Sequence, residues 1–264
     1  MSTINLHFQS FGQGPKIILL HGLFGSWENL GSIARSLASD YQVYCLDLRN
    51  HGRSPHTDVM NYDLMSEDVY RFMQLHGIDK AHLLGHSMGG KTAMQLALNH
   101  PEVVDKLLVA DIAPVQYPPH HEAIIAGLQS LDLASLASRA DAEKQLANYV
   151  NELPVRQFLL KNLVKSGAAS FTWRMNLAAI IANYPAISAG QTAPKGTLPH
   201  GYQGPVLFIK GGNSDYITAK YASLVATLFP HAVMRIIPST GHWLHAEKPA
   251  LFLQIVRRFL TDML

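Results

Sequence analysis

The sequence has one cysteine in 264 residues, no run of like charges and no long apolar stretch. The single cysteine, Cys45, excludes a disulfide framework, and its place in the apolar run 43–46 is typical of a small buried side chain. The formal net charge of +2 is spread along the chain, so no nucleic-acid partner is predicted. No apolar run approaches the ~20 residues of a membrane-spanning helix.

The first residues also lack the features of an export leader. Residues 1–7 contain neither a charged start followed by an apolar core nor a cleavage site of small residues. We therefore expect a cytoplasmic protein without a membrane span. With 48% hydrophobic residues the chain can bury a large core, which predicts one globular domain with an inserted subdomain.

Short apolar runs alternate with segments of helical periodicity. The runs, which predict strands, lie at 17–20, 43–46, 82–85, 107–110, 206–209 and 233–237, after a first strand at 4–8. The run at 17–20 is of the kind that is buried on both faces. Helical patterns occupy approximately 30–37, 64–76, 88–99, 219–228 and 251–260. Strands alternating with helices predict an α/β fold whose mostly parallel central sheet is flanked by helices.

The alternation stops between residues 113 and 204. This segment has helical apolar faces interrupted by Pro154, Gly167, Pro185, Pro194 and Pro199. We interpret it as an inserted helical cap, so that residues 1–112 and 205–264 form the core. The alternative is a helical extension packed away from any site. The insertion begins at the strand end next to a candidate nucleophile, which favours the cap.

That nucleophile is Ser87, in the sequence Gly85-His86-Ser87-Met88-Gly89 between a predicted strand and a predicted helix. A serine attacks a carbonyl only when a base removes its proton, so its Oγ must stand clear of the backbone. A sharp strand-to-helix turn achieves this, and Gly85 and Gly89 leave room for it. The pattern is that of a nucleophile elbow.

Other polar residues follow predicted strands at the same sheet edge, where the functional loops of such a fold gather. They are His21-Gly22-Leu23, Asp47, Asp111, Ser214 and Asp215. With these motifs the chain resembles the α/β-hydrolase family along nearly its whole length outside the insertion. The matching motifs are His21 to Gly25, Asp47 to Ser54, Gly85 to Gly90 and Gly241-His242-Trp243. Within the family, Gly85 to Lys91, Asp111 to Val115 and Gly211 to Ser214 most resemble small bacterial esterases of the YbfF type.

The resemblance assigns roles to particular residues. It implies that Ser87 is the nucleophile and that His242, near the C-terminus, is its base. His245 is the nearest competitor, and we interpret it as a structural contact. The family pattern places the oxyanion donors at the backbone N–H groups of Leu23 and Met88.

The acid of the relay has two candidates. Many relatives carry it three residues after a glycine at the end of the strand that here ends at Gly211, but that position holds Ser214, and Asp215 is displaced by one. The family's second position is occupied by Asp111, 24 residues after Ser87. One helix and one strand span that separation, so the two would lie side by side, and Asp111 is favoured. Ser214 would then support Asp111 or His242, while Asp47 and Arg49 brace the neighbouring loop.

The implied function is hydrolysis of small acyl esters or thioesters, with no cofactor and no metal. Alternatives on the same scaffold are carbon–carbon bond hydrolysis, a lyase or haloperoxidase reaction, or a ligand receptor with negligible turnover. An aspartate nucleophile, as in dehalogenases and epoxide hydrolases, is disfavoured by Ser87. Candidates for an apolar acyl pocket are Phe24, Met88, Tyr117, Trp173, Met175, Tyr184 and Trp243. For the aromatic residues inside the insertion, the alternative is that they form its own core. Basic residues that could meet a coenzyme A phosphate, or form an ordinary solvated face, are Arg139, Lys144, Arg156, Lys161 and Lys165.

Overall fold

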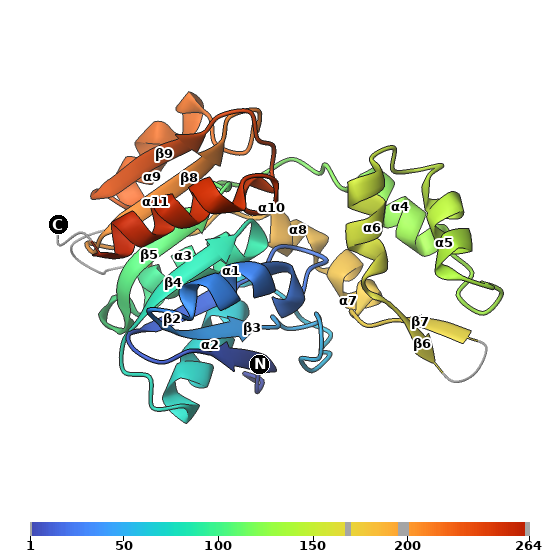
Figure 1. Cartoon of the computed structure of the whole chain (residues 1–264), viewed down its shortest axis with the longest axis horizontal. Coiled ribbons are helices and arrows are strands. Elements are labelled where there is room, and N and C mark those ends of the chain that lie inside the picture. Colours follow the sequence, from blue (N-terminus) through green and yellow to red (C-terminus); the bar gives the residue numbers. More distant parts are fainter. Residues whose placement is uncertain (1, 167–169, 195–200, 262–264) are drawn as a thin grey trace.

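A seven-stranded sheet between two layers of helices forms the centre of the protein, and a lobe of shorter elements stands beside it (Figure 1). The computed structural model describes residues 2–166, 170–194 and 201–261. Within these residues the alternation of strands and helices builds the α/β class that the sequence predicts.

The strands of the sheet lie in the order β1-β3-β2-β4-β5-β8-β9. Strand β1 runs antiparallel to β3, and all other neighbouring pairs are parallel. Strands β2, β4 and β5 are mostly buried because helices cover both of their faces, whereas most of the edge strand β9 is exposed. The bounds are β1 (Phe8–Phe11), β2 (Lys16–Leu20), β3 (Gln42–Leu46), β4 (Ala81–His86), β5 (Val104–Ala110), β8 (Val206–Gly211) and β9 (Ala232–Ile237).

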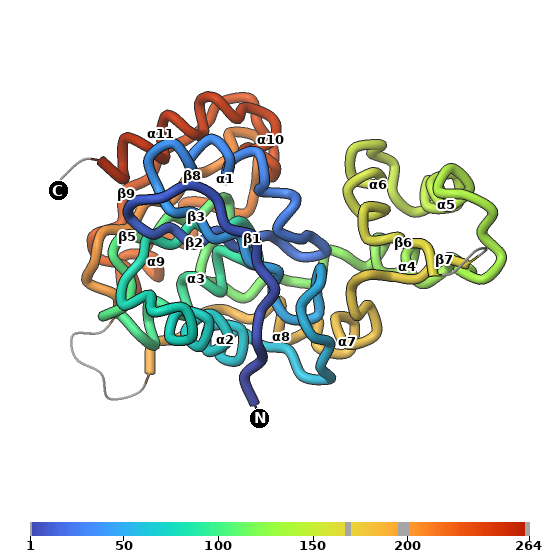
Figure 2. The backbone as a smooth tube through the Cα atoms, turned by 60° about the horizontal axis from the view of Figure 1, so that its bottom comes forward, coloured from blue at the N-terminus to red at the C-terminus, as the bar shows by residue number. Residues whose placement is uncertain are grey.

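Helices α1 and α11 cover one face of the sheet, and α2, α3 and α9 cover the other (Figure 2). Ala93 and Ala97 of α3 are fully buried, and their small side chains let this helix lie close to the sheet. The bounds are α1 (Gly31–Leu37), α2 (Tyr62–Leu75), α3 (Met88–Asn99), α9 (Ala222–Leu228), α10 (Leu244–Glu247) and α11 (Pro249–Thr261).

The first strand differs from the predicted one. The alternating residues 4–8 predict a strand there, but the ladder begins at Phe8, opposite Leu46, and ends at Phe11. Residues before Phe8 are held by other partners: the N–H of Ile4 donates to Asp68 of α2 over 2.9 Å, and Leu6 is buried in the core. The alternation therefore reflects packing beside α2 rather than strand pairing.

The inserted segment contains helices and also a β-hairpin that its pattern does not predict. Its elements are α4 (Glu122–Ser130), α5 (Arg139–Leu146), α6 (Leu153–Leu160), β6 (Leu163–Ser166), β7 (Ser170–Trp173), α7 (Leu177–Ala182) and α8 (Tyr184–Ser188). Elements α4 to β7, that is residues 122–166 and 170–173, form the lobe seen beside the sheet (Figure 1). Residues 167–169 and 195–200 of the predicted insertion lie outside the described residues.

The two ends of the inserted segment lie together on the core. The N–H of Tyr117, near its start, donates to the carbonyl of Ser188, near its end, over 2.9 Å. Tyr62 of α2 donates its hydroxyl to the carbonyl of Ile187 in α8, and Gln95 of α3 contacts Thr192. Helix α8 therefore packs with the core rather than with the lobe. In the described part of the chain, none of the helices combines the length and apolarity that crossing a membrane requires.

Candidate active site

Ser87 stands at the turn between β4 and α3 in a strained conformation, with φ 54° and ψ −119°. The two glycines flanking it are required by space. A Cβ at Gly85 would lie 2.2 Å from the carbonyl oxygen of Gly89, and a Cβ at Gly89 would lie 2.2 Å from that of Leu20. Only glycine at both positions lets β2, β4 and α3 approach so closely. The turn therefore has the geometry of the predicted elbow.

Asp111 follows β5 and is completely buried. Its Oδ1 accepts the backbone N–H of Gly211 over 2.9 Å, and its Oδ2 accepts the Ser214 hydroxyl and, over 2.8 Å, His242 Nδ1. Because a carboxylate only accepts, Nδ1 of His242 carries the proton and Nε2 is the acceptor. The neighbouring candidate, Asp215, is exposed to solvent.

Two neighbouring side chains hold His242, one against the face of its ring and one at its backbone carbonyl. The ring of Tyr216 stacks on it with centroids 4.0 Å apart and an interplanar angle of 26°. The carbonyl of His242 accepts Nε2–H of His86 over 2.8 Å. A ring over an imidazole favours its cationic form, which arises when the base takes a proton. Sequence reasoning did not identify either supporting side chain.

The competing histidine, His245, lies in α10 against His86, with ring centroids 4.5 Å apart. Burial lowers the pKa of His245 to about 4, which makes it a weak base at neutral pH. Its Nδ1 has no hydrogen-bond partner among the described residues. Of the two candidate bases, His242 is the one that the carboxylate of Asp111 orients.

Leu23 and Met88, the predicted oxyanion donors, flank the serine. Leu23 lies in the turn after β2, which Gly25 N–H closes onto the carbonyl of Gly22 over 3.0 Å. The turn runs against Ser87, since a Cβ at Gly22 would be 3.3 Å from that of Ser87. Met88 is the first residue of α3, and a backbone N–H at that position has no acceptor within its own helix. The positive end of the helix dipole adds to its attraction for an anion.

Two buried histidines brace this turn. His21 donates from Nδ1 to the carbonyl of Gly22 and accepts the N–H of Leu48 on Nε2. His51 accepts the N–H of Phe24 on Nε2 over 3.1 Å. Burial lowers the pKa of His21 to about 4 and that of His51 to about 3, which keeps both rings neutral and their Nε2 atoms able to accept. The His-Gly pairs at 21–22 and 51–52 are the only sequence signal for them.

Asp47 and Arg49 make structural contacts, as the sequence suggests. Asp47 accepts the backbone N–H groups of Trp27 over 2.7 Å and Arg53 over 2.9 Å. Arg49 forms a buried two-pronged ion pair with Asp68 of α2, at 2.6 and 2.8 Å. These bonds fix the loop after β3 beside the turn that carries Leu23.

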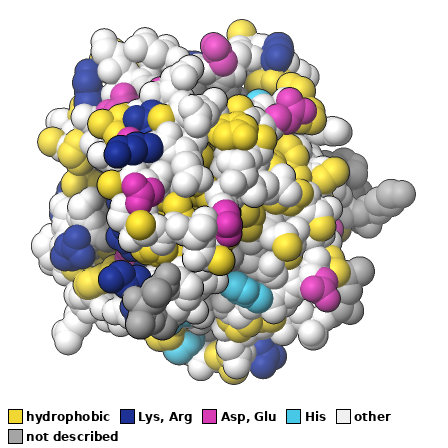
Figure 3. Space-filling view, turned by 90° about the vertical axis from the view of Figure 1, so that its right-hand side faces the viewer, with side chains coloured by type: hydrophobic (Ala, Val, Ile, Leu, Met, Phe, Trp, Pro, Cys, Tyr) yellow, Lys and Arg dark blue, Asp and Glu magenta, His cyan; other side chains and the backbone are white. Residues whose placement is uncertain are grey.

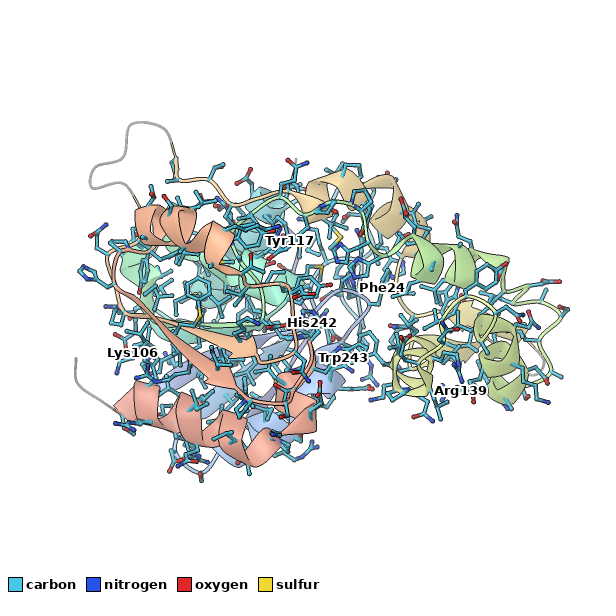
Figure 4. All side chains as sticks on the ribbon, turned by 90° about the horizontal axis from the view of Figure 1, so that it is seen from above. Phe24, Lys106, Tyr117, Arg139, His242 and Trp243 are labelled. Atoms are coloured by element: carbon cyan, nitrogen blue, oxygen red, sulfur yellow. The ribbon has the colours of Figure 1, made fainter. Side chains whose placement is uncertain are left out.

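Ser87 borders two cavities of very different size. A cleft of about 930 Å³ extends between the core and the lobe, and its walls include His242, Phe158 and Trp243. A second cavity of about 30 Å³ reaches the other way, toward Lys91 and Ile187. Figure 4 places His242, Trp243 and Phe24 on the side of the core that faces the lobe, with Lys106 at the opposite end. Of the residues suggested for an acyl pocket, Phe24, Met88, Tyr117, Tyr184 and Trp243 line one or other cavity, whereas Trp173 and Met175 line neither.

Lys91, buried in α3, was not identified from the sequence. Its ammonium donates to the carbonyl of Val115 over 2.7 Å and to that of Ala189 over 2.6 Å, so it joins both ends of the inserted segment. It also lies over the ring of Tyr117, 4.8 Å from the centroid. Burial lowers the pKa of Lys91 to about 7.

In the described ranges, no group of three or more His, Cys, Asp or Glu side chains is arranged to hold a metal ion.

The sequence profile of the alpha/beta hydrolase fold matches residues 15–249, and the chain belongs to this family. It is 40% identical to Esterase YbfF of Escherichia coli over 93% of both chains. It is 41% identical to the sn-1-specific diacylglycerol lipase ABHD11 of Mus musculus, covering 94% of this chain and 81% of the mouse protein. The structure of a marine microorganism esterase superposes with a TM-score of 0.93 at 41% identity, covering 97% of this chain and all of the other. These relatives group the chain with the carboxylic ester hydrolases of the family.

Proposed function

We propose that this protein is a serine carboxylesterase that hydrolyses short-acyl esters through an acyl-enzyme on Ser87. The observation that carries the proposal is the hydrogen bond from His242 Nδ1 to the buried Asp111 carboxylate, on the wall of the cleft that Ser87 also borders. The esterase and lipase names of relatives that share most of the chain support the reaction class.

The reaction follows from the protonation state of the base. Nε2 of His242 accepts the Ser87 proton as Oγ attacks the ester carbonyl, and Asp111 stabilises the imidazolium that forms. The N–H groups of Leu23 and Met88 stabilise the oxyanion, and the imidazolium then protonates the departing alcohol. A water molecule activated by the same histidine hydrolyses the acyl-enzyme and frees Ser87. Ser214 supports the relay through its bond to Asp111.

The two cavities define the shape of the substrate. The two groups on the carbonyl at Ser87 diverge, and the two cavities offer one place for each. The cavity of about 30 Å³ is the smaller of the two and suits a group of few atoms. We assign it to the acyl chain, which favours acetyl and propionyl esters. The cleft of about 930 Å³, with the lobe acting as its cap, takes the alcohol.

A thioester with the same short acyl group is the second substrate class. Two of the suggested cations are already engaged inside the lobe: Arg139 donates to the carbonyl of Leu163, and Arg156 pairs with Glu143 over 3.1 Å. Lys161 borders the cleft. On the face of the molecule nearest the lobe, acidic and basic side chains are interspersed with hydrophobic ones (Figure 3). This arrangement favours an uncharged alcohol over coenzyme A.

The test is a panel of p-nitrophenyl esters from two to sixteen carbons, with the matching acyl-coenzyme A compounds. We expect kcat/KM to be highest for the shortest esters, and the Ser87→Ala variant to lose roughly 10⁴- to 10⁶-fold in kcat with its circular dichroism unchanged. Undiminished turnover in Ser87→Ala would refute the proposal. A long-chain optimum would instead place the acyl chain in the larger cleft and favour a glyceride lipase, as the mouse relative is named.

A further inference from the structure

The turn that carries the Leu23 amide contains a residue in an unfavourable backbone conformation. Leu23 and Phe24 are the two central residues of the turn from Gly22 to Gly25. Phe24 has φ of 60°, in the left-handed region that a residue with a Cβ rarely enters. Such a conformation persists only where the surroundings hold it. The direction of the Leu23 N–H therefore depends on the contacts that hold Phe24 in this backbone conformation.

Both backbone polar groups of Phe24 are held, one from the core and one from the lobe. Its N–H donates to His51 of the core, and its carbonyl accepts Nδ2 of Asn162 over 2.6 Å. Asn162 follows α6 and is only 4% exposed. The same amide donates to the carbonyl of Leu159 in α6 over 3.2 Å, so it connects this helix directly to the turn. Phe24 lies between the core and the lobe (Figure 4).

We propose that Asn162 is a positioning residue for the oxyanion hole, so that the hole is complete only when the lobe is docked on the core. The inference rests on the proposed ester hydrolysis, because the Leu23 amide stabilises charge only if an oxyanion forms at Ser87. Removing the amide of Asn162 leaves the Phe24 carbonyl buried without its donor. The turn then relaxes toward negative φ at Phe24. Because the turn is closed at Gly22 and Gly25, the preceding dihedral angles must change to compensate, and this moves the Leu23 N–H away from the substrate carbonyl.

The chain contains a matched control in Asn183. Its Nδ2 also donates to one carbonyl of the inserted segment, that of Ala179 over 2.8 Å. It donates as well to one carbonyl of the core, that of Asp58 over 2.7 Å. Asp58 lies in the loop after β3 and outside the Gly22–Gly25 turn. Loss of either asparagine amide weakens the attachment of the inserted segment, but only Asn162 contacts the turn.

The experiment compares Asn162→Leu and Asn183→Leu with the wild-type protein. It measures kcat and KM for p-nitrophenyl acetate, the affinity for a trifluoromethyl ketone that forms an oxyanion on Ser87, and the melting temperature. We expect kcat of Asn162→Leu to fall about 10- to 100-fold, below the ~10² to 10³ lost with a whole oxyanion donor. Ketone affinity falls by the same factor, and KM stays within about twofold. The shape of the pH profile of kcat/KM is unchanged, because the His242–Asp111 bond is intact.

Asn183→Leu should lower the melting temperature without these losses. If Asn162→Leu does not fold, Asn162→Asp, which has the same shape but an acceptor in place of the donor, gives the same comparison. Wild-type kcat and ketone affinity in the Asn162 variant, or equal losses in the Asn183 variant, would overturn the inference. If the wild-type protein hydrolyses no ester, the proposed function fails separately. The rate at which a fluorophosphonate labels Ser87 then tests the role of Asn162, since the phosphoryl oxygen of the probe occupies the oxyanion hole. Slower labelling in the Asn162 variant than in the Asn183 variant supports the inference, and equal rates overturn it.

Discussion

Replacing Asp111 with asparagine tests the relay at its buried end. The Asp111 carboxylate accepts the N–H of Gly211 on one oxygen, and the Ser214 hydroxyl and His242 Nδ1 on the other. An asparagine amide has one oxygen and one NH2 group, so one of these positions must become a donor. The backbone N–H of Gly211 cannot accept. The amide oxygen must therefore face Gly211, and the NH2 group must face His242.

That orientation forces the other tautomer on His242. Nδ1 becomes the acceptor and Nε2 carries the proton, so Nε2 cannot take the proton of Ser87. In serine relays this tautomeric change lowers kcat by ~10⁴, which corresponds to about 5.4 kcal/mol of transition-state stabilisation. The fold should persist, because asparagine tolerates the φ of 52° at which Asp111 stands.

The assay is steady-state hydrolysis of p-nitrophenyl acetate, with circular dichroism to confirm folding. Asp215→Asn is the matched control, since it makes the same exchange at an exposed carboxyl four positions after Gly211. We expect near wild-type turnover in this control and the ~10⁴-fold loss only at Asp111. A tenth or more of wild-type kcat in Asp111→Asn, or a comparable loss in Asp215→Asn, would refute the reasoning.

Three further predictions follow from the geometry of the site. Gly85→Ala places a Cβ 2.2 Å from the carbonyl oxygen of Gly89, so we expect loss of turnover together with a lower melting temperature. Tyr216→Leu removes the ring stacked on His242 and should lower kcat about 2- to 5-fold, whereas Tyr216→Phe keeps the ring and a near wild-type kcat. Burial lowers the pKa of His21 from 6.5 to about 4, so between these values the unfolded chain binds the proton and the native protein does not. The free energy of unfolding in urea should therefore fall as the pH drops through that window, and a constant value across it would contradict the neutral form of His21.

The core of the fold could be predicted because its strands are buried on both faces. The apolar runs at 17–20, 82–85 and 107–110 fall within β2, β4 and β5, and the sheet places them side by side. Periodicity is less informative where burial has another cause. Residues 4–8 alternate because Leu6 packs into the core and Ile4 bonds to α2, so the ladder starts only at Phe8.

The inserted segment was harder to predict because its elements are short and partly exposed. Strands β6 and β7 have four residues each, and only Leu163 among them is fully buried. Phe171, Thr172 and Trp173 are typical strand residues, but the surrounding helical spacing of leucines obscured that signal. The hairpin is therefore a tertiary feature that its local pattern specifies weakly.

In the site, residues that belong to a local sequence motif could be predicted, whereas residues placed there by contacts between distant segments could not. Ser87 needs an elbow, and an elbow needs glycines at set positions, so its motif is local. Asn162 and Lys91 donate to carbonyls 138 and 98 positions away, and Tyr216 stacks on the ring of His242, so no local spacing encodes these contacts. Their side-chain types are also common in surface helices and loops, where they need no partner.

The choice of Asp111 over Asp215 has a physical basis in the sheet. Ser87 and Asp111 are linked through β5, since Ser87 N–H donates to the carbonyl of Ala110 over 3.0 Å. The residue that would hold the acid after β8 is Ser214, and its hydroxyl donates to Asp111. A carboxylate at Ser214 would face that of Asp111 at hydrogen-bond distance, and two such charges raise the pKa of one another. With a hydroxyl at position 214 and Asp215 exposed to solvent, Asp111 is the one carboxyl that contacts His242 among the two candidates, and Ser214 supports it.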